Sequence, residues 1–113
     1  MIEGCCHCGA VRLTLPEPPE DLGSCNCSIC RRLGGLWGYY RPDQVAVSDP
    51  DGHLTGYVQG DATLTTWHCG QCGCTTHWSP RDPDYQRMGV NLRLFDPAVW
   101  EKLPRRHIDG ASW

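Results

Sequence analysis

The sequence of 113 residues contains no long apolar segment, and this argues against a membrane-spanning helix. No stretch approaches the roughly 18 consecutive apolar residues that a helix needs to cross a bilayer. The first residues, Met1 to Gly4, have neither the basic nor the apolar region of a secretory signal peptide. We therefore expect a cytoplasmic protein without a membrane partner.

An excess of positive charge is also missing, because ten lysine and arginine residues stand against thirteen acidic ones, for a net charge of −3. A protein that binds a nucleic-acid backbone needs an excess of positive charge, so we expect no nucleic-acid partner. No repeat of fixed period is visible either. The length predicts a single domain over residues 1–113, near the small end of what one hydrophobic core stabilises without metal or disulfides.

Long helical patterns are absent, because thirteen glycines and nine prolines interrupt the chain repeatedly. Apolar and polar residues alternate over 11–15 and 90–94, which predicts half-buried strands in an antiparallel sheet. Further strands are predicted over 36–40, 44–47, 54–58, 64–68 and 75–78. Asp96 and Pro97 predict one short helical turn. Residues 105–113 read as a loosely held C-terminal tail whose Trp113 could dock on the domain.

Cysteine is the abundant reactive residue, with nine in the chain and seven of them in three tight clusters. In a reducing compartment such a chain is more suited to binding metal than to forming disulfides. The clusters contain Cys6 and Cys8, then Cys25, Cys27 and Cys30, then Cys69 and Cys72. Four plus three ligands indicate two Zn²⁺ sites per chain, one closed and structural and one with an open coordination position.

The closed site is predicted to join the first and last clusters. Residues two apart on an extended strand project to one side, so Cys6 and Cys8 can present both sulfurs to one ion. The other pair is Cys69 and Cys72. Gly70 lies between these two cysteines and Gly73 follows them, and both glycines would allow a tight turn with positive φ. Two cysteines remain, Cys5 and Cys74, which we interpret as small buried hydrophobic residues, with Cys74 as an alternative reserve ligand.

The middle cluster is the predicted catalytic site, because Cys25, Cys27 and Cys30 can converge on one metal ion that keeps a free position. Such an ion can bind an incoming thiol and keep it as a thiolate at neutral pH. Arg31 and Arg32 follow directly and could pair with substrate carboxylates. They could equally neutralise the anionic thiolates or face solvent.

Three motifs in this order resemble the glutathione-dependent formaldehyde-activating enzyme family, which includes the centromere protein V domain. They are Gly4-Cys5-Cys6-His7-Cys8-Gly9-Ala10-Val11, Cys25-Asn26-Cys27-Ser28-Ile29-Cys30-Arg31-Arg32 with Gly34-Gly35, and Cys69-Gly70-Gln71-Cys72-Gly73. The resemblance covers about residues 4–94. It departs from the family at Asn26, where many members have histidine.

The resemblance implies a small zinc-stabilised fold of the β-tent type, with the same division of the seven cysteines between a structural and a catalytic zinc. It also implies a carbon–sulfur lyase reaction run in reverse, in which glutathione and formaldehyde condense to S-hydroxymethylglutathione. A related thiol or another aldehyde would fit the same open site. The partners expected are therefore a small thiol and a small aldehyde, and a homo-oligomer is left open.

A proton must reach the alkoxide that such a reaction forms, and His77 is the residue that we assign to this role, ahead of His68 or a water molecule. The alternative for His77 is a structural strand histidine. The alternative for the whole chain is a non-enzymatic zinc-binding module for protein interaction. In that case His7, His53, His68, Cys74 or a partner chain would fill the fourth position of the middle cluster.

Overall fold

Short strands make up most of the regular backbone of this protein, whose computed structural model describes residues 1–60 and 62–112. The strands are β1 (Ile2–Cys5), β2 (Arg12–Leu15), β3 (Leu22–Cys25), β4 (Trp37–Tyr40), β5 (Ala46–Ser48), β6 (Leu54–Val58), β7 (Leu64–Cys69), β8 (Thr75–Pro80), β9 (Met88–Asn91) and β10 (Arg105–Ile108). The helical segments are single turns, namely α1 (Cys30–Leu33), α2 (Pro97–Trp100), η1 (Pro42–Gln44), η2 (Leu92–Leu94) and η3 (Gly110–Ser112). The predicted mostly β fold with little helix is confirmed.

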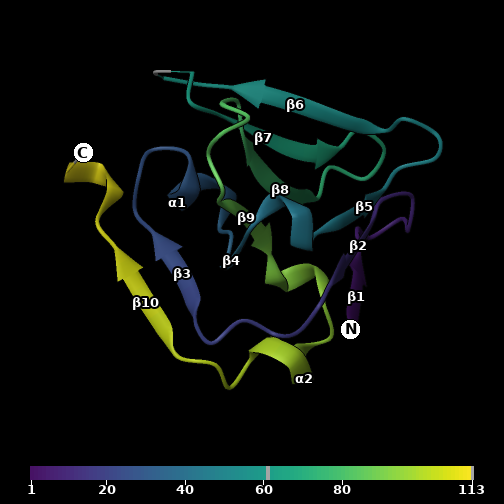
Figure 1. Ribbon diagram of the computed structural model, residues 1–113, viewed down its shortest axis with the longest axis horizontal. Helices are drawn as coiled ribbons and strands as arrows, with labels where there is room; N and C mark the ends of the chain where they lie inside the picture. The colour runs from purple at the N-terminus through teal and green to yellow at the C-terminus, as the bar shows by residue number, and fades with distance from the viewer. Residues whose placement is uncertain (61, 113) are drawn as a thin grey trace.

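The strands form two sheets, as Figure 1 shows. A small sheet has the order β1-β2-β5, and a seven-stranded sheet has the order β10-β3-β4-β9-β8-β7-β6. All pairings are antiparallel except that of β10 with β3, which is parallel. The predicted antiparallel fold thus holds for the described pairings except this one, at the edge of the larger sheet. A parallel neighbour requires a crossover connection, and here β10 reaches β3 after 79 intervening residues, 26–104.

The C-terminal segment forms regular structure instead of the loose tail that the sequence predicted. Its strand β10 pairs with β3, and the Leu22 backbone N–H donates to the Pro104 carbonyl at 2.9 Å just before the pairing begins. Arg106 forms a solvent-exposed ion pair with Asp21, with 3.3 Å between Nε and Oδ2. The predicted docking of Trp113 lies outside the described residues.

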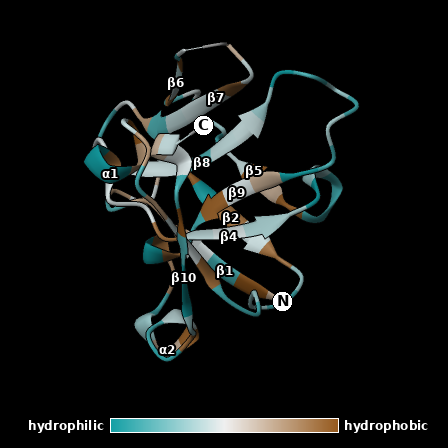
Figure 2. Ribbon diagram, turned by 90° about the vertical axis from the view of Figure 1, so that its left-hand side faces the viewer, coloured by the Kyte–Doolittle hydropathy of each residue, from teal (hydrophilic) through white to brown (hydrophobic). Residues whose placement is uncertain are grey.

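Most of the core lies between the two sheets. Leu13 and Leu15 of β2 are fully buried and pack with Leu22, Val90 and Leu92 of the larger sheet and its η2 extension. Hydrophobic residues gather on β1, β2 and β9 in Figure 2, whereas the long loops are mostly hydrophilic. A second, smaller cluster consists of Cys6, Val11 and Cys69. The thiols of that cluster thus replace part of a conventional core.

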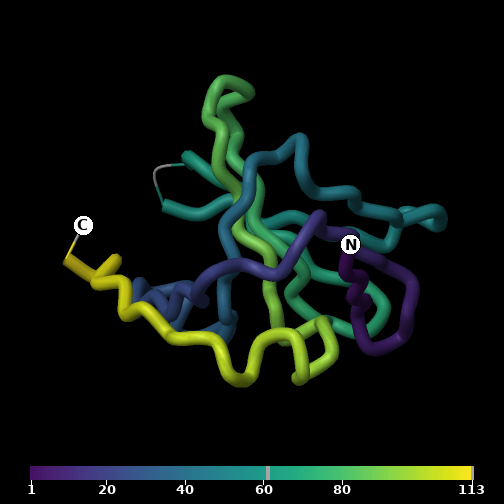
Figure 3. Tube along the Cα trace, turned by 60° about the horizontal axis from the view of Figure 1, so that its bottom comes forward, coloured from purple at the N-terminus to yellow at the C-terminus, as the bar shows by residue number. Residues whose placement is uncertain are grey.

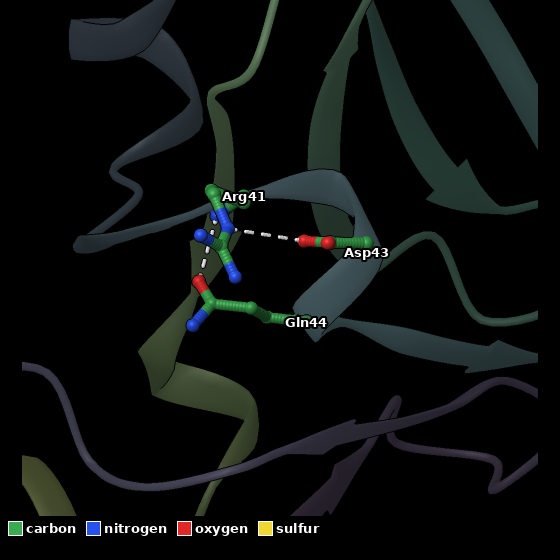
Figure 4. A network of polar contacts seen from close by, with 3 residues as sticks. All are labelled: Arg41, Asp43 and Gln44. Atoms are coloured by element: carbon green, nitrogen blue, oxygen red, sulfur yellow. Dashed lines mark hydrogen bonds and ion pairs between the residues drawn. The ribbon is translucent and has the colours of Figure 1, made fainter.

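Two of the predicted strands are displaced along the chain. The strand expected over 90–94 ends at Asn91, whose side-chain oxygen accepts a hydrogen bond from the Arg93 backbone at 3.2 Å and caps η2. The strand expected over 44–47 is shifted to Ala46–Ser48, because Gln44 closes the turn η1. In that turn Gln44 Oε1 accepts from the Arg41 backbone N–H at 2.9 Å, and Asp43 pairs with the Arg41 side chain (Figure 4).

The remaining predicted elements are confirmed. Strands β2, β4, β6, β7 and β8 lie where alternation and turn signals placed them, and α2 starts after Asp96, whose carboxylate accepts from the Ala98 backbone N–H at 2.9 Å. Within the described part of the chain, no helix has the length and apolar character needed to cross a membrane.

Candidate metal and thiol site

Four of the predicted ligands meet in one cluster, which we call the four-cysteine cluster (Cys6, Cys8, Cys69 and Cys72). Their sulfur atoms all lie within 4.8 Å of one another. The Sγ atoms of Cys6 and Cys8 are 3.6 Å apart, as are those of Cys8 and Cys69. Tetrahedral zinc with Zn–S bonds of about 2.3 Å places its sulfurs about 3.8 Å apart. The cluster therefore has the donor set and nearly the spacing of a closed zinc site.

Two tight turns deliver these thiols. Cys6 and Cys8 do not lie on an extended strand, as the sequence suggested, but in a turn after β1 that the Gly9 N–H closes by donating to the Cys6 carbonyl at 3.0 Å. In the second turn Gly73 has a φ of 83°, as predicted. Gly70 does not take positive φ; it is required because a Cβ there would lie 2.9 Å from the His53 carbonyl oxygen.

Backbone N–H groups in these turns favour thiolates. The N–H groups of Cys74 and Cys8 lower the pKa of Cys72 to about 5. The Val11 N–H lies 3.4 Å from Cys6 Sγ. Cys74 packs beside this cluster without joining the four ligands. A set of thiolates this close is mutually repulsive unless a cation neutralises it.

The three remaining ligands form the three-cysteine cluster (Cys25, Cys27 and Cys30), whose sulfurs also lie within 4.8 Å of one another. Cys25 ends β3, and Cys30 begins α1. The Cys27 N–H approaches Cys25 Sγ at 3.5 Å, and the Cys30 N–H approaches Cys27 Sγ at 3.4 Å. Burial opposes ionisation of Cys27, but the backbone N–H of Cys30 helps to lower the pKa of Cys27 below its usual value. Burial and the neighbouring Cys27 raise the pKa of Cys30.

The buried indole of Trp37 tests whether these thiols fit a metal ion. Trp37 is 1% exposed, and its Nε1–H has no hydrogen-bond partner among the described residues. This N–H nevertheless interacts favourably with the Cys30 sulfur when the sulfur is charged, although the contact falls short of hydrogen-bond geometry. An unpaired buried donor costs about 1–3 kcal/mol. A metal-bound thiolate at Cys30 would supply the missing acceptor, so the arrangement fits a zinc ion.

The three-cysteine cluster has no fourth ligand within the described part of the chain. Among the described residues, no other His, Cys, Asp or Glu brings a ligand atom within 4.8 Å of all three sulfurs. The candidates His7, His53, His68 and Cys74 are therefore not gathered there. Instead, a pocket of about 300 Å³ opens beside Cys25 and Cys30.

The lining of this pocket is positively charged. Arg31, Arg93, Arg105 and His107 contribute to it, and none of the described residues that line it is acidic. The Arg93 guanidinium is held in place because its Nε donates to the Gly34 carbonyl at 3.2 Å. A small molecule that carries carboxylates matches this charge.

The structure separates the two arginines that the sequence treated alike. Arg31 lines the pocket, whereas Arg32 donates from its guanidinium to the Ser28 carbonyl at 2.6 Å and is not among the lining residues. His77 does not line the pocket either. It is buried in β8, joined to Thr76 Oγ1 by a hydrogen bond of 2.8 Å, and burial lowers its pKa to about 4.

Sequence reasoning missed Arg93, Arg105 and His107. Two of them arrive on β10, whose parallel pairing with β3 aligns His107 with Ser24, next to the first thiol of the cluster. The basic run Arg105-Arg106-His107 could have indicated Arg105 and His107, because such a run is unusual in a chain with only ten lysine and arginine residues.

Two known proteins are similar to this chain. A protein of Halomonas elongata, provisionally named a glutathione-dependent formaldehyde-activating enzyme, is 50% identical over 105 residues. The alignment covers 91% of this chain but 60% of that relative, so the chain spans well under the relative's full length. A crystal structure of a Rhodobacter sphaeroides protein, a structural-genomics target, superposes with a TM-score of 0.76 at 32% identity and covers 93% of this chain and 100% of the other.

The family's sequence profile matches almost the whole chain. The match covers residues 1–108, which include all seven cysteines of the two clusters and the strand β10. The chain therefore belongs to the glutathione-dependent formaldehyde-activating enzyme family.

Proposed function

We propose that this protein is a zinc-dependent enzyme of the carbon–sulfur lyase type that condenses glutathione, or a related thiol, with formaldehyde or another small aldehyde. One observation carries the proposal: three thiols converge beside a cationic pocket and no fourth protein ligand among the described residues joins them. The four-cysteine cluster would hold a structural zinc and the three-cysteine cluster a catalytic one. A cytoplasmic location remains a prediction that goes with these free thiols.

When bound, zinc would lower the pKa of an incoming thiol so that it stays a thiolate at neutral pH. Arg31, Arg93 and Arg105 would hold the carboxylates of the thiol compound and orient its sulfur toward the aldehyde. The thiolate then attacks the carbonyl carbon, a C–S bond forms, and the C=O π electrons move to oxygen. A proton completes the product.

His107 is our choice of proton donor, in place of His77. It lines the pocket and is exposed to solvent, from which it can be reprotonated. His77 is buried with a pKa lowered to about 4, so its imidazole is neutral and sheltered at physiological pH. The reaction needs no oxidant or reductant, because it only adds the S–H group of the thiol across the C=O bond of the aldehyde.

A native mass spectrum with glutathione titrated in tests this proposal. Two zinc ions per chain and a glutathione adduct support it. Two zinc ions without an adduct favour the non-enzymatic module or a different thiol. One zinc ion or none, in a sample protected from metal loss, contradicts the division of the seven cysteines into two sites.

Replacing Arg31 or Arg105 with alanine is expected to raise the Kd for glutathione about fivefold to tenfold, because each loses a partly exposed charge-assisted hydrogen bond. Isothermal titration calorimetry with each variant measures this change. Arg32→Ala is the matched control, since Arg32 bonds to Ser28 outside the pocket lining and should leave the Kd unchanged. A larger effect at Arg32 than at Arg31 would place the carboxylates elsewhere.

A further inference from the structure

The end of the described chain lies against the loop that carries the three-cysteine cluster. The pairing of β10 with β3 places Ile108 opposite Cys25. The contact continues one residue further, because the Asn26 backbone N–H donates to the Ile108 carbonyl at 3.0 Å. Figures 1 and 3 show this C-terminal segment running beside β3. The next residues, 109 and 110, stay beside this loop, because a Cβ built on Gly110 would lie within 3.1 Å of atoms of Cys25 and Cys27.

The side chain of Asn26 fastens this turn. Its Nδ2 donates to Asp109 Oδ1 at 2.9 Å, and its Oδ1 accepts from the Ala111 backbone N–H at 2.9 Å. The second oxygen of Asp109 accepts from the Ser112 hydroxyl at 2.6 Å. Asn26 thus uses both its donor and its acceptor on a segment that is 83 to 85 positions away in sequence. It stands between two of the thiols, Cys25 and Cys27.

Gly110 brings the backbone of this segment directly onto the cluster. The residue is buried, and a Cβ placed on it would lie 2.7 Å from Cys25 Sγ and 3.1 Å from Cys27 Cβ. Only glycine permits so close an approach. Gly110 is not among the residues that line the cationic pocket. Cys25 and Asn26 do line it, so the segment covers Cys25 and Cys27 next to the pocket without itself contributing to the lining.

We propose that Asp109 to Ser112 form a strap over the three-cysteine cluster and that Asn26, which fastens it, is a positioning residue for Cys25 and Cys27. The strap restricts the conformations of two of the three thiols before any ligand binds, so less entropy is lost when they converge on an ion. It also leaves the cationic pocket as the open approach to the cluster. The role of the strap in preparing a zinc site rests on the proposed function. Its effect on the thiols themselves can be measured whether or not zinc is bound.

The test is the rate at which each cysteine of the full-length protein reacts with iodoacetamide, resolved by peptide mass spectrometry. Asn26→Ala is expected to speed alkylation of Cys25 and Cys27 about fivefold to tenfold, as the loss of one or two exposed hydrogen bonds implies. Cys6 and Cys69 should react at their wild-type rates. Gly110→Ala should have the same effect, since its added carbon displaces the strap while every Asn26 bonding group remains.

Gln71→Ala provides the matched control, because it removes an exposed amide side chain beside the other cluster. It should change no rate at the three-cysteine cluster. Wild-type rates at Cys25 and Cys27 in both strap variants would overturn the proposal, as would an equal increase at all seven cysteines, which would indicate general loosening. The zinc content of the same samples tests the proposed metal binding separately. The strap proposal and the zinc proposal can therefore fail independently.

Discussion

Replacing Cys69 with serine should destabilise the whole domain. Cys69 is fully buried, and its sulfur lies 3.6 Å from that of Cys8, 61 positions earlier in the chain. Structural zinc contributes about 10–16 kcal/mol in zinc-finger peptides, whereas an entire domain is stable by about 5–15 kcal/mol. We expect the midpoint of thermal unfolding to fall by about 15 °C or more, or the variant to aggregate. Circular dichroism and zinc content measure both effects.

Cys5→Ser is the control for this substitution. Cys5 lies partly buried in β1, next to the four-cysteine cluster but outside it. The same change of sulfur to oxygen should therefore lower the unfolding midpoint by no more than about 5 °C. A Cys69→Ser protein as stable as Cys5→Ser would show that the four-cysteine cluster does not stabilise the fold.

Replacing Cys27 with serine should remove the chemistry and spare the fold. Cys27 is the middle thiol of the three-cysteine cluster, lies in a loop between β3 and α1, and is a member of neither core cluster. Two thiols hold zinc far more weakly than three. We expect the zinc content to fall from two ions to one, the glutathione adduct to disappear, and the unfolding midpoint to shift by less than about 5 °C.

Ser28→Ala is the matched control, because it changes an exposed side chain in the same loop without touching a thiol. It should keep both zinc ions and the adduct. If Cys27→Ser kept the adduct, the thiol would bind elsewhere. If it unfolded as readily as Cys69→Ser, the proposed division between a structural and a catalytic site would be wrong.

Local patterns in the sequence predicted much of the fold. Strand β6 was placed correctly to the residue, and the helical turn at Asp96 and Pro97 follows from an N-cap and a proline that act within one turn. The grouping of the cysteines followed from spacing and from the number of ligands that zinc needs. Each of these predictions depends on residues that are close in sequence or on a donor count.

Long-range contacts explain what the sequence did not predict. Strand β10 has no alternation of its own and is ordered by its parallel partner β3. The pocket histidine is consequently His107, although His77 stands close to a cysteine motif in the sequence. The turn at Cys6 and Cys8 depends on Gly9, whose φ of 80° no apolar pattern indicates.

The wide separation of the contacts that close the fold has a practical consequence for preparing the protein. The four-cysteine cluster joins positions 61 residues apart, and β10 pairs with β3 across the 79 intervening residues 26–104. Such non-local contacts form late in folding. Nine thiols therefore remain accessible to oxidation in the unfolded chain. Refolding from denaturant should accordingly succeed only when a reductant and zinc are both supplied before the denaturant is removed.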